Sequence, residues 1–123
     1  MGLFTSTEVD AASIQSDFAG ILLPDEQVLV AFKAIRDTVF LTSHRFVLVD
    51  VQGLTGSKVS VQSVPYRSII RFSVETAGTF DLDSDLSIWV SGSATPLTVK
   101  VSRAADPQRI QRLLAEHVLG SRK

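Results

Sequence analysis

The feature of this sequence that most constrains its fold is a change in apolar period near residue 28. Before that point apolar residues recur at helical spacing, whereas from residue 28 to residue 101 they alternate with polar residues in short runs. A period of two is typical of strands, whose successive side chains point to opposite faces of a sheet. Turn residues separate the runs, so the pattern predicts an antiparallel meander of seven short strands. The predicted strands are 28–35, 38–42, 45–50, 58–64, 68–75, 86–90 and 97–101.

The segment before the meander predicts an N-terminal helix over 6–22. Its apolar residues form one stripe, and Thr5 and Glu8 have the spacing of a capping box. Pro24 ends the segment, because proline cannot continue a helix. The stripe does not say whether this helix docks on its own barrel or on a neighbouring chain.

The segment after the meander predicts a C-terminal helix over 106–119. Asp106 is a suitable N-cap, Pro107 suits the first helical position, and Gly120 suits the exit. The sequence therefore predicts a mainly β fold: a seven-stranded antiparallel β-barrel over 28–101, closed by the C-terminal helix, with the N-terminal helix in addition.

Length, composition and charge limit the classes of protein to consider. A chain of 123 residues with 45% hydrophobic residues fits a single domain, 1–123, with one core. The absence of cysteine excludes disulfides and thiolate chemistry, and fits a cytoplasmic protein. A net charge of −1 argues against nucleic acid as a partner. The start of the chain lacks the basic and apolar regions of a signal peptide.

Charge is distributed along the chain in blocks. Residues 1–27 carry five acidic residues and no basic one, and residues 75–98 carry four acidic residues and no basic one. The two remaining blocks, 28–74 and 99–123, each contain six basic and two acidic residues. Such blocks can form complementary patches between copies of the chain, or they can mix once the chain folds.

No catalytic, cofactor or metal site is predicted. His117 lies on the apolar stripe of the C-terminal helix, where a half-buried structural histidine is expected. His44 follows Ser43, but adjacency in sequence is not the geometry of a nucleophile and its base. Two histidines without cysteine do not make a zinc site. The alternating aspartates of 81–85 lack the glycine and the glutamate of a calcium loop.

Several short motifs occur together and in order along the chain. They are Leu23-Pro24-Asp25-Glu26, Arg36-Asp37, Phe40-Leu41-Thr42-Ser43-His44-Arg45, Asp50-Val51-Gln52-Gly53-Leu54-Thr55-Gly56, Val64-Pro65-Tyr66, Val74-Glu75-Thr76-Ala77-Gly78 and Leu86-Ser87-Ile88-Trp89. Together these motifs closely resemble the bacterial pleckstrin-homology (PH-like) domain family, which was first defined as a domain of unknown function. The resemblance extends from about residue 20 to the end of the chain. It implies a PH fold, no known enzymatic activity and a tendency to form ring-like homo-oligomers.

The resemblance does not bring a phosphoinositide site with it. Eukaryotic members that bind phosphoinositides use a long basic first hairpin loop. Here the corresponding hairpin, residues 33–37, is short and has Asp37 at its tip. Two small basic patches could contact anionic lipid or an acidic partner, although solvated strand faces are the favoured explanation of them. They consist of Lys33, Arg36 and Arg45, and of Arg67 and Arg71 beside Tyr66.

Trp89 is the main candidate for an interface between chains. Alternation places it outward, and an exposed tryptophan is typical of binding hot spots. The other interpretation is that the N-terminal helix covers it within the same chain. Ile14 and Phe18 on the stripe of that helix are further interface candidates.

Three functional hypotheses follow. The leading one is a non-enzymatic PH-like module that self-associates, for instance as a ring, and scaffolds a protein partner. The alternative is a peripheral membrane protein that recognises anionic lipid through a basic patch. An enzyme would need converging titratable side chains in a deep pocket, which the sequence does not predict.

Overall fold

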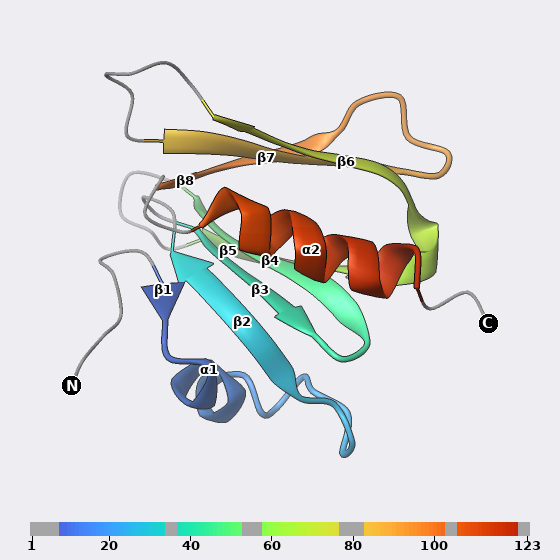
Figure 1. The fold of residues 1–123 in the computed structure, drawn as a ribbon. Coiled ribbons are helices and arrows are strands. Elements are labelled where there is room, and N and C mark those ends of the chain that lie inside the picture. Colours follow the sequence, from blue (N-terminus) through green and yellow to red (C-terminus); the bar gives the residue numbers. More distant parts are fainter. Residues whose placement is uncertain (1–7, 34–36, 53–57, 77–82, 103–105, 121–123) are drawn as a thin grey trace.

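A computed structural model describes residues 8–33, 37–52, 58–76, 83–102 and 106–120. The seven predicted strands are present, and an eighth, very short strand precedes them (Figure 1). The elements are β1 (Glu8–Val9), α1 (Ala11–Asp17), β2 (Val28–Lys33), β3 (Thr38–Thr42), β4 (Arg45–Gln52), β5 (Lys58–Pro65), the 3₁₀ turn η1 (Tyr66–Ser68), β6 (Ile69–Thr76), β7 (Asp83–Val90), β8 (Leu97–Ser102) and α2 (Pro107–Val118).

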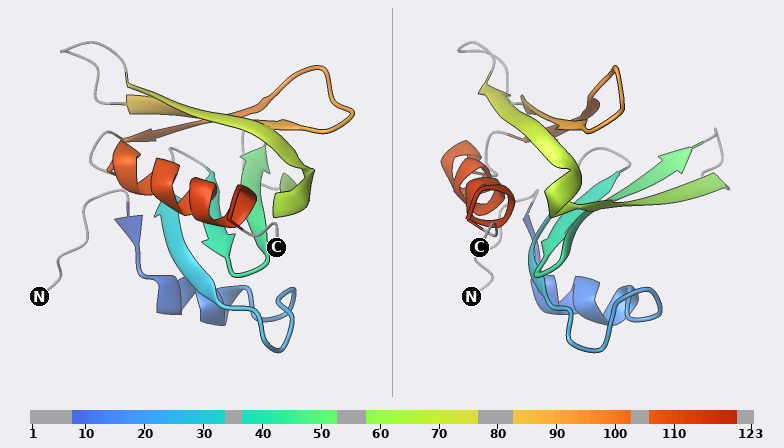
Figure 2. Two further views of the ribbon diagram at one scale, coloured as in Figure 1. Left: turned by 45° about the vertical axis from the view of Figure 1, so that its right-hand side comes forward. Right: turned by 90° about the vertical axis from the view of Figure 1, so that its right-hand side faces the viewer.

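The strands form two antiparallel sheets. One sheet has the order β1-β2-β3-β4-β5 and the other has the order β6-β7-β8. Figure 2 shows the two sheets facing one another, with α2 lying across one side of the space between them. Among the described residues no hydrogen-bonded ladder joins the sheets. The prediction of a mainly β fold with seven antiparallel strands and a C-terminal helix is confirmed, whereas a closed barrel is not seen.

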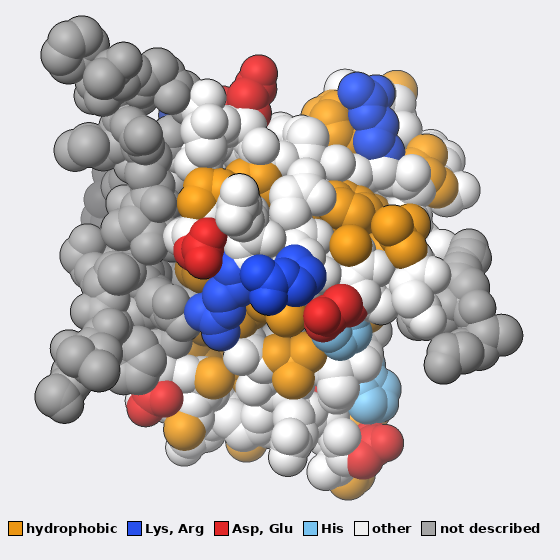
Figure 3. All heavy atoms as spheres, in the orientation of Figure 1, with side chains coloured by type: hydrophobic (Ala, Val, Ile, Leu, Met, Phe, Trp, Pro, Cys, Tyr) orange, Lys and Arg blue, Asp and Glu red, His pale blue; other side chains and the backbone are white. Residues whose placement is uncertain are grey.

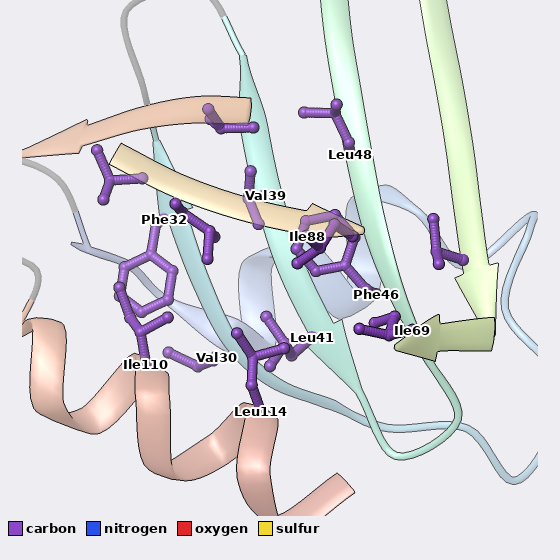
Figure 4. Packing of buried hydrophobic residues seen from close by; sticks show 14 of the residues in the cluster. Val30, Phe32, Val39, Leu41, Phe46, Leu48, Ile69, Ile88, Ile110 and Leu114 are labelled. Atoms are coloured by element: carbon purple, nitrogen blue, oxygen red, sulfur yellow. The ribbon is translucent and has the colours of Figure 1, made fainter. Parts of the chain in front are cut away.

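The core lies between the two sheets and α2. Alternate side chains of the larger sheet meet Ile88 and Leu86 of the smaller one, and Ile110 and Leu114 of α2 point into the same space (Figure 4). Ile110 and Leu114 are almost completely buried. The helix thus fills the side where the sheets diverge, as its apolar stripe predicts. The core includes Val30, Phe32, Val39, Leu41, Phe46, Leu48, Val64, Tyr66, Ile69, Leu86, Ile88, Val99, Val101, Ile110, Leu114 and Val118.

The predicted limits of α2 are confirmed to within one residue. The Asp106 side chain accepts a hydrogen bond from the Arg109 N–H, as an N-cap does. At the other end, the N–H groups of Leu119 and Gly120 both donate to the Ala115 carbonyl. A Cβ at Gly120 would lie 2.6 Å from the Glu116 carbonyl oxygen, so this exit requires glycine.

The predicted N-terminal helix is too long by several residues at each end. Residues 8 and 9 pair with β2 as a strand, and Asp10, rather than Thr5, caps the helix by accepting from the Ala12 N–H at 3.1 Å. The proposed capping box is therefore wrong, since Glu8 lies in the strand; Thr5 itself is outside the described residues. Pairing with β2 gives residues 8 and 9 backbone hydrogen bonds, and these stabilise a strand more than the weak local helix propensity stabilises a helix.

Helix α1 packs on its own chain. It covers the outer face of the larger sheet, opposite the core, where Ile14 is 6% exposed and the rings of Phe18 and Phe40 lie 5.1 Å apart. Gln15 strengthens the attachment, since its amide donates to the Glu26 carbonyl and accepts from the Val28 N–H. The question that the sequence left open is thereby answered, and burial removes Ile14 from the candidates for an interface between chains.

Candidate functional site

A surface groove lies at the end of the larger sheet where β3 turns into β4. Two adjoining hollows of about 340 and 490 Å³ share His44, Pro65 and Arg67 as lining residues. We call them together the corner groove. The first hollow is also lined by Ser43, Tyr66 and His117, and the second by Ile21, Leu23, Arg45 and Ser63.

Arg45, which lines the second hollow of the corner groove, forms an ion pair with the buried carboxylate of Glu26. The Arg45 Nε donates to Glu26 Oε2 at 2.8 Å, and its Nη2 donates to Glu26 Oε1 at 2.9 Å. The remaining donors of the guanidinium reach the Ile21 carbonyl at 2.6 Å and the Ser63 hydroxyl at 2.8 Å. Glu26 is 1% exposed, and a buried carboxylate needs such partners.

The carboxylate of Glu26 receives further support from its surroundings. The Thr42 hydroxyl and the Leu23 N–H both donate to it. These contacts, above all the bond from Arg45, lower the pKa of Glu26 to about 2 even though burial acts in the opposite direction. The pair in turn raises the pKa of Arg45. The loop before β2 is therefore fixed to the β3–β4 turn.

Tyr66 completes the wall of the corner groove. It is 5% exposed, and its hydroxyl donates to the Thr42 carbonyl at 2.6 Å. Burial, with a smaller effect of the negative charge on Glu26, raises the pKa of this phenol. Its ring packs against the His117 imidazole, with centroids 4.8 Å apart, and His117 Nδ1 lies 2.9 Å from the Leu113 carbonyl. His117 is thus half-buried, as its place on the helix stripe predicts.

Ser43, His44 and Asp25 form a chain of contacts that sequence reasoning did not expect. The Ser43 hydroxyl lies 2.8 Å from His44 Nδ1, and Nε2 of the same ring lies 3.5 Å from Asp25. A hydrolase triad needs a buried acid that holds the imidazole, whereas the Asp25 side chain is 81% exposed. The Ser43 hydroxyl also accepts from the Gln27 N–H at 3.1 Å. These hydrogen bonds and contacts support a structural role for the turn between β3 and β4.

The four described basic residues among those predicted to form patches do not gather on one surface. Lys33 is opposite Thr38 at the β2–β3 hairpin, whereas Arg45 is the first residue of β4, beyond the other end of β3. The guanidinium of Arg45 is moreover already paired with the carboxylate of Glu26. The patch of Lys33, Arg36 and Arg45 is therefore wrong as far as Arg45 is concerned, because strand register separates it from Lys33; Arg36 lies outside the described residues.

The second predicted patch is also divided. Arg67 is exposed and lines the corner groove. Arg71 is the cross-strand partner of Trp89 in the smaller sheet, and its guanidinium lies over the indole at 4.3 Å from the centroid. This cation–π contact half-covers Trp89. The N-terminal helix lies on the other sheet, so the interpretation that it covers Trp89 is wrong.

The open edge of the larger sheet carries exposed valines. Val59 and Val61 of β5 are 55% and 43% exposed and lie opposite Val51 and Val49 of β4. Val49 is covered by α1, and the apolar surface continues beyond the helix to the sheet edge. We call Val51, Val59 and Val61 the valine row. Alternation with a period of two predicts that Val59 and Val61 lie on the same face of the sheet. It does not predict whether that face is turned toward the core or away from it.

Figure 3 shows one face of the molecule, on which the two histidines lie near one another and acidic, basic and apolar side chains are interspersed. Among the described residues, no three histidine or acidic side chains converge as metal ligands. None of the described helices has the length and hydropathy needed to span a bilayer.

Comparison with known proteins identifies the family. A model described as "Bacterial PH domain" matches residues 2–118. This chain belongs to the bacterial PH domain family. The uncharacterized protein YjqA of Bacillus subtilis is 47% identical to this PH domain over 114 residues, which are 92% of this chain and 91% of YjqA. The uncharacterized protein YozO of the same organism is 26% identical, over 96% of this chain and 98% of YozO.

Two solved structures have the same fold. A DUF1696 family protein with a pleckstrin-homology domain from Shewanella loihica has a TM-score of 0.81 and 40% identity, over 90% of this chain and 95% of that one. A pleckstrin homology domain from Shewanella amazonensis has a TM-score of 0.80 and 42% identity, over 96% of this chain and 95% of that one. The predicted resemblance and PH-like fold are confirmed, and no enzymatic family is indicated.

Proposed function

We propose that this PH domain is a non-enzymatic assembly module that associates with copies of itself and scaffolds a protein partner. The single observation that carries the proposal is the valine row on the open edge of the larger sheet. Val59 and Val61 are about half exposed, and covering them on association contributes on the order of 1–2 kcal/mol.

The backbone of β5 supports the same conclusion. Within the described part of the chain, β5 pairs only with β4, so the N–H and C=O groups of its outer side have no ladder partner. Such edges are normally protected by charge or proline. Here Lys58 and Pro65 stand at the two ends, and the residues between them carry no charge. An unpaired edge that has no charge between its ends and carries exposed valines favours pairing with another chain.

A ring would need a second, different surface on each copy, because head-to-tail contacts join unlike patches. The outer side of the smaller sheet is our candidate for it. Ile70 is 68% exposed on its edge strand β6, and Arg71 of the same strand lies over Trp89 of the neighbouring strand β7. Tryptophan and arginine are the residues most enriched at binding hot spots.

The test is the solution mass by size-exclusion chromatography with light scattering over a concentration series. We expect a discrete multimer for the wild type and a shift toward single chains for Val61→Lys, which places a charge in the valine row. Leu119→Lys is the matched control, because Leu119 is 64% exposed but lies at the end of α2, outside the valine row. A wild type that remains a single chain throughout, or two variants with equal masses, would refute the proposal.

A further inference from the structure

We propose that the corner groove binds a short peptide segment in which an acidic side chain lies between apolar ones. The carboxylate would pair with Arg67, and an apolar neighbour would cover Ile21 and Leu23. This site is separate from the valine row and does not depend on self-association.

Arg67 is the cation available to such a ligand. It lies in the turn η1, is exposed, and makes no hydrogen bond or ion pair with another described residue. No aspartate or glutamate lines either hollow of the groove. Arg45 also lines the second hollow, but its charge is already matched by Glu26. A guanidinium binds a carboxylate through two parallel hydrogen bonds, which fixes the orientation of the ligand as well as attracting it.

Apolar surface lies beside this cation. Ile21 and Leu23 are 41% and 52% exposed, and both line the hollow that also contains Arg67. Their loop is held in place, because the Ile21 carbonyl accepts from Arg45 and the Leu23 N–H donates to Glu26. A site whose backbone is already ordered loses little entropy when a ligand binds. A cation next to fixed apolar surface matches an acidic residue with apolar neighbours.

Asp25 distinguishes a peptide from a membrane surface. It stands beside the groove, 3.5 Å from His44, with its side chain 81% exposed. An exposed carboxylate at this rim repels any anion, and it repels a broad anionic surface more strongly than a single carboxylate bound at Arg67. Removing the charge of Asp25 should therefore strengthen the binding of an acidic peptide.

The probe is a fluorescein-labelled peptide of sequence LLDELL, with LLNQLL as its uncharged counterpart, and binding is followed by fluorescence anisotropy. We expect the acidic peptide to bind the full chain more tightly than the amide peptide. Arg67→Ala should weaken binding about tenfold or more, the loss typical of a charge-assisted hydrogen bond. Arg67→Lys should weaken it less, Leu23→Ser should also weaken it, and Asp25→Asn should strengthen it.

Arg112→Ala is the matched control, because Arg112 is an exposed arginine of α2 outside the corner groove. An equal loss for Arg112→Ala and Arg67→Ala would overturn the proposal, since it would indicate attraction by net charge alone. Equal binding of the two peptides would overturn it as well. So would an Arg67-dependent affinity for phosphatidylglycerol vesicles, or for inorganic phosphate, without any affinity for the acidic peptide.

Discussion

Glu26 is a buried acid that the fold tolerates because Arg45 reaches it from the next hairpin. The two residues are 19 positions apart, and the pairing of β2 with β3, in which Val28 lies opposite Thr42, brings them together. Local sequence shows an acid after a proline and an arginine in a turn, and both look like surface residues. The pair explains why Arg45 does not take part in a basic patch, and it fixes the loop that forms one wall of the corner groove.

The stability of this PH domain should depend on the ionisation of Glu26. Its pKa is about 2 in the folded chain, against 4.5 as the ordinary value. The folded state therefore favours the ionised acid, so the stabilisation is fully present above pH 4.5 and is lost as the pH falls toward 2. We expect this single group to account for about 3 kcal/mol of the free energy of unfolding.

Urea denaturation of wild type and Glu26→Gln at a series of pH values tests this prediction. The variant should be less stable at neutral pH, and the difference between the two proteins should shrink through the acidic range. Asp17→Asn serves as the control, because Asp17 is an exposed acid on α1. A difference between wild type and Glu26→Gln that is constant with pH would contradict the assignment.

Helix α1 depends for its stability on its cap and on its contacts with the larger sheet. It has seven residues, fewer than an isolated helix needs in water, so docking and capping must hold it. Ile14 and Phe18 provide the docking, and Asp10 provides the cap. Its position on the outer face extends the apolar surface of the larger sheet toward the valine row.

Removing the cap should destabilise this element measurably. We expect Asp10→Ala to lower the free energy of unfolding by about 1 kcal/mol, because the Ala12 N–H loses its acceptor. Asp10→Asn should lose much less, since asparagine also caps helices. Chemical denaturation measures both. Equal losses for the two substitutions would show that the charge of Asp10, rather than its hydrogen bond, is what matters.

Strand β7 presents the only tryptophan of the chain, so its fluorescence reports on the smaller sheet. The Arg71 guanidinium lies over the indole of Trp89. We expect Arg71→Ala to move the emission maximum to longer wavelength, because water replaces the guanidinium on that face. The cation–π contact itself should contribute about 0.5–1 kcal/mol to stability.

The same signal tests Trp89 as an interface residue. If the outer side of the smaller sheet is the second contact of the assembly, wild-type emission should move to shorter wavelength over the concentrations at which the mass rises. An emission maximum that stays constant while the mass rises would remove Trp89 from the interface.

On the scale of the whole molecule, α2 joins the two sheets into one core. Leu114 is 0% exposed and belongs to the cluster that contains side chains of both sheets. We expect Leu114→Ala to cost about 2–5 kcal/mol, the range for large-to-small changes in a core. Gln111→Ala, at an exposed position of the same helix, should change stability by less than about 0.5 kcal/mol.

Urea denaturation followed by circular dichroism and by Trp89 fluorescence measures both variants. Because α2 packs against both sheets, the two signals should report one coincident transition in wild type and in Leu114→Ala. Separate transitions would show that the smaller sheet, which contains Trp89, unfolds independently of the rest.

Local patterns in the sequence were sufficient for the strands and for α2. Alternation located all seven strands of the meander, and Asp106 and Gly120 marked the ends of the helix. These signals depend on residues within a few positions of one another, and backbone geometry translates them directly into structure. The short sequence motifs between residues 23 and 89 were enough to indicate the family, because they occur together and in order along the chain.

Contacts between distant segments settled the remaining features. Alternation shows that Val59 and Val61 share a face, but only the packing of α1 on the same sheet makes it the outer face. The Glu26–Arg45 pair and the pairing of β1 with β2 likewise join residues far apart in sequence. Their free energy comes from burial and hydrogen bonds that exist only after the chain has folded, so no local pattern carries their signature.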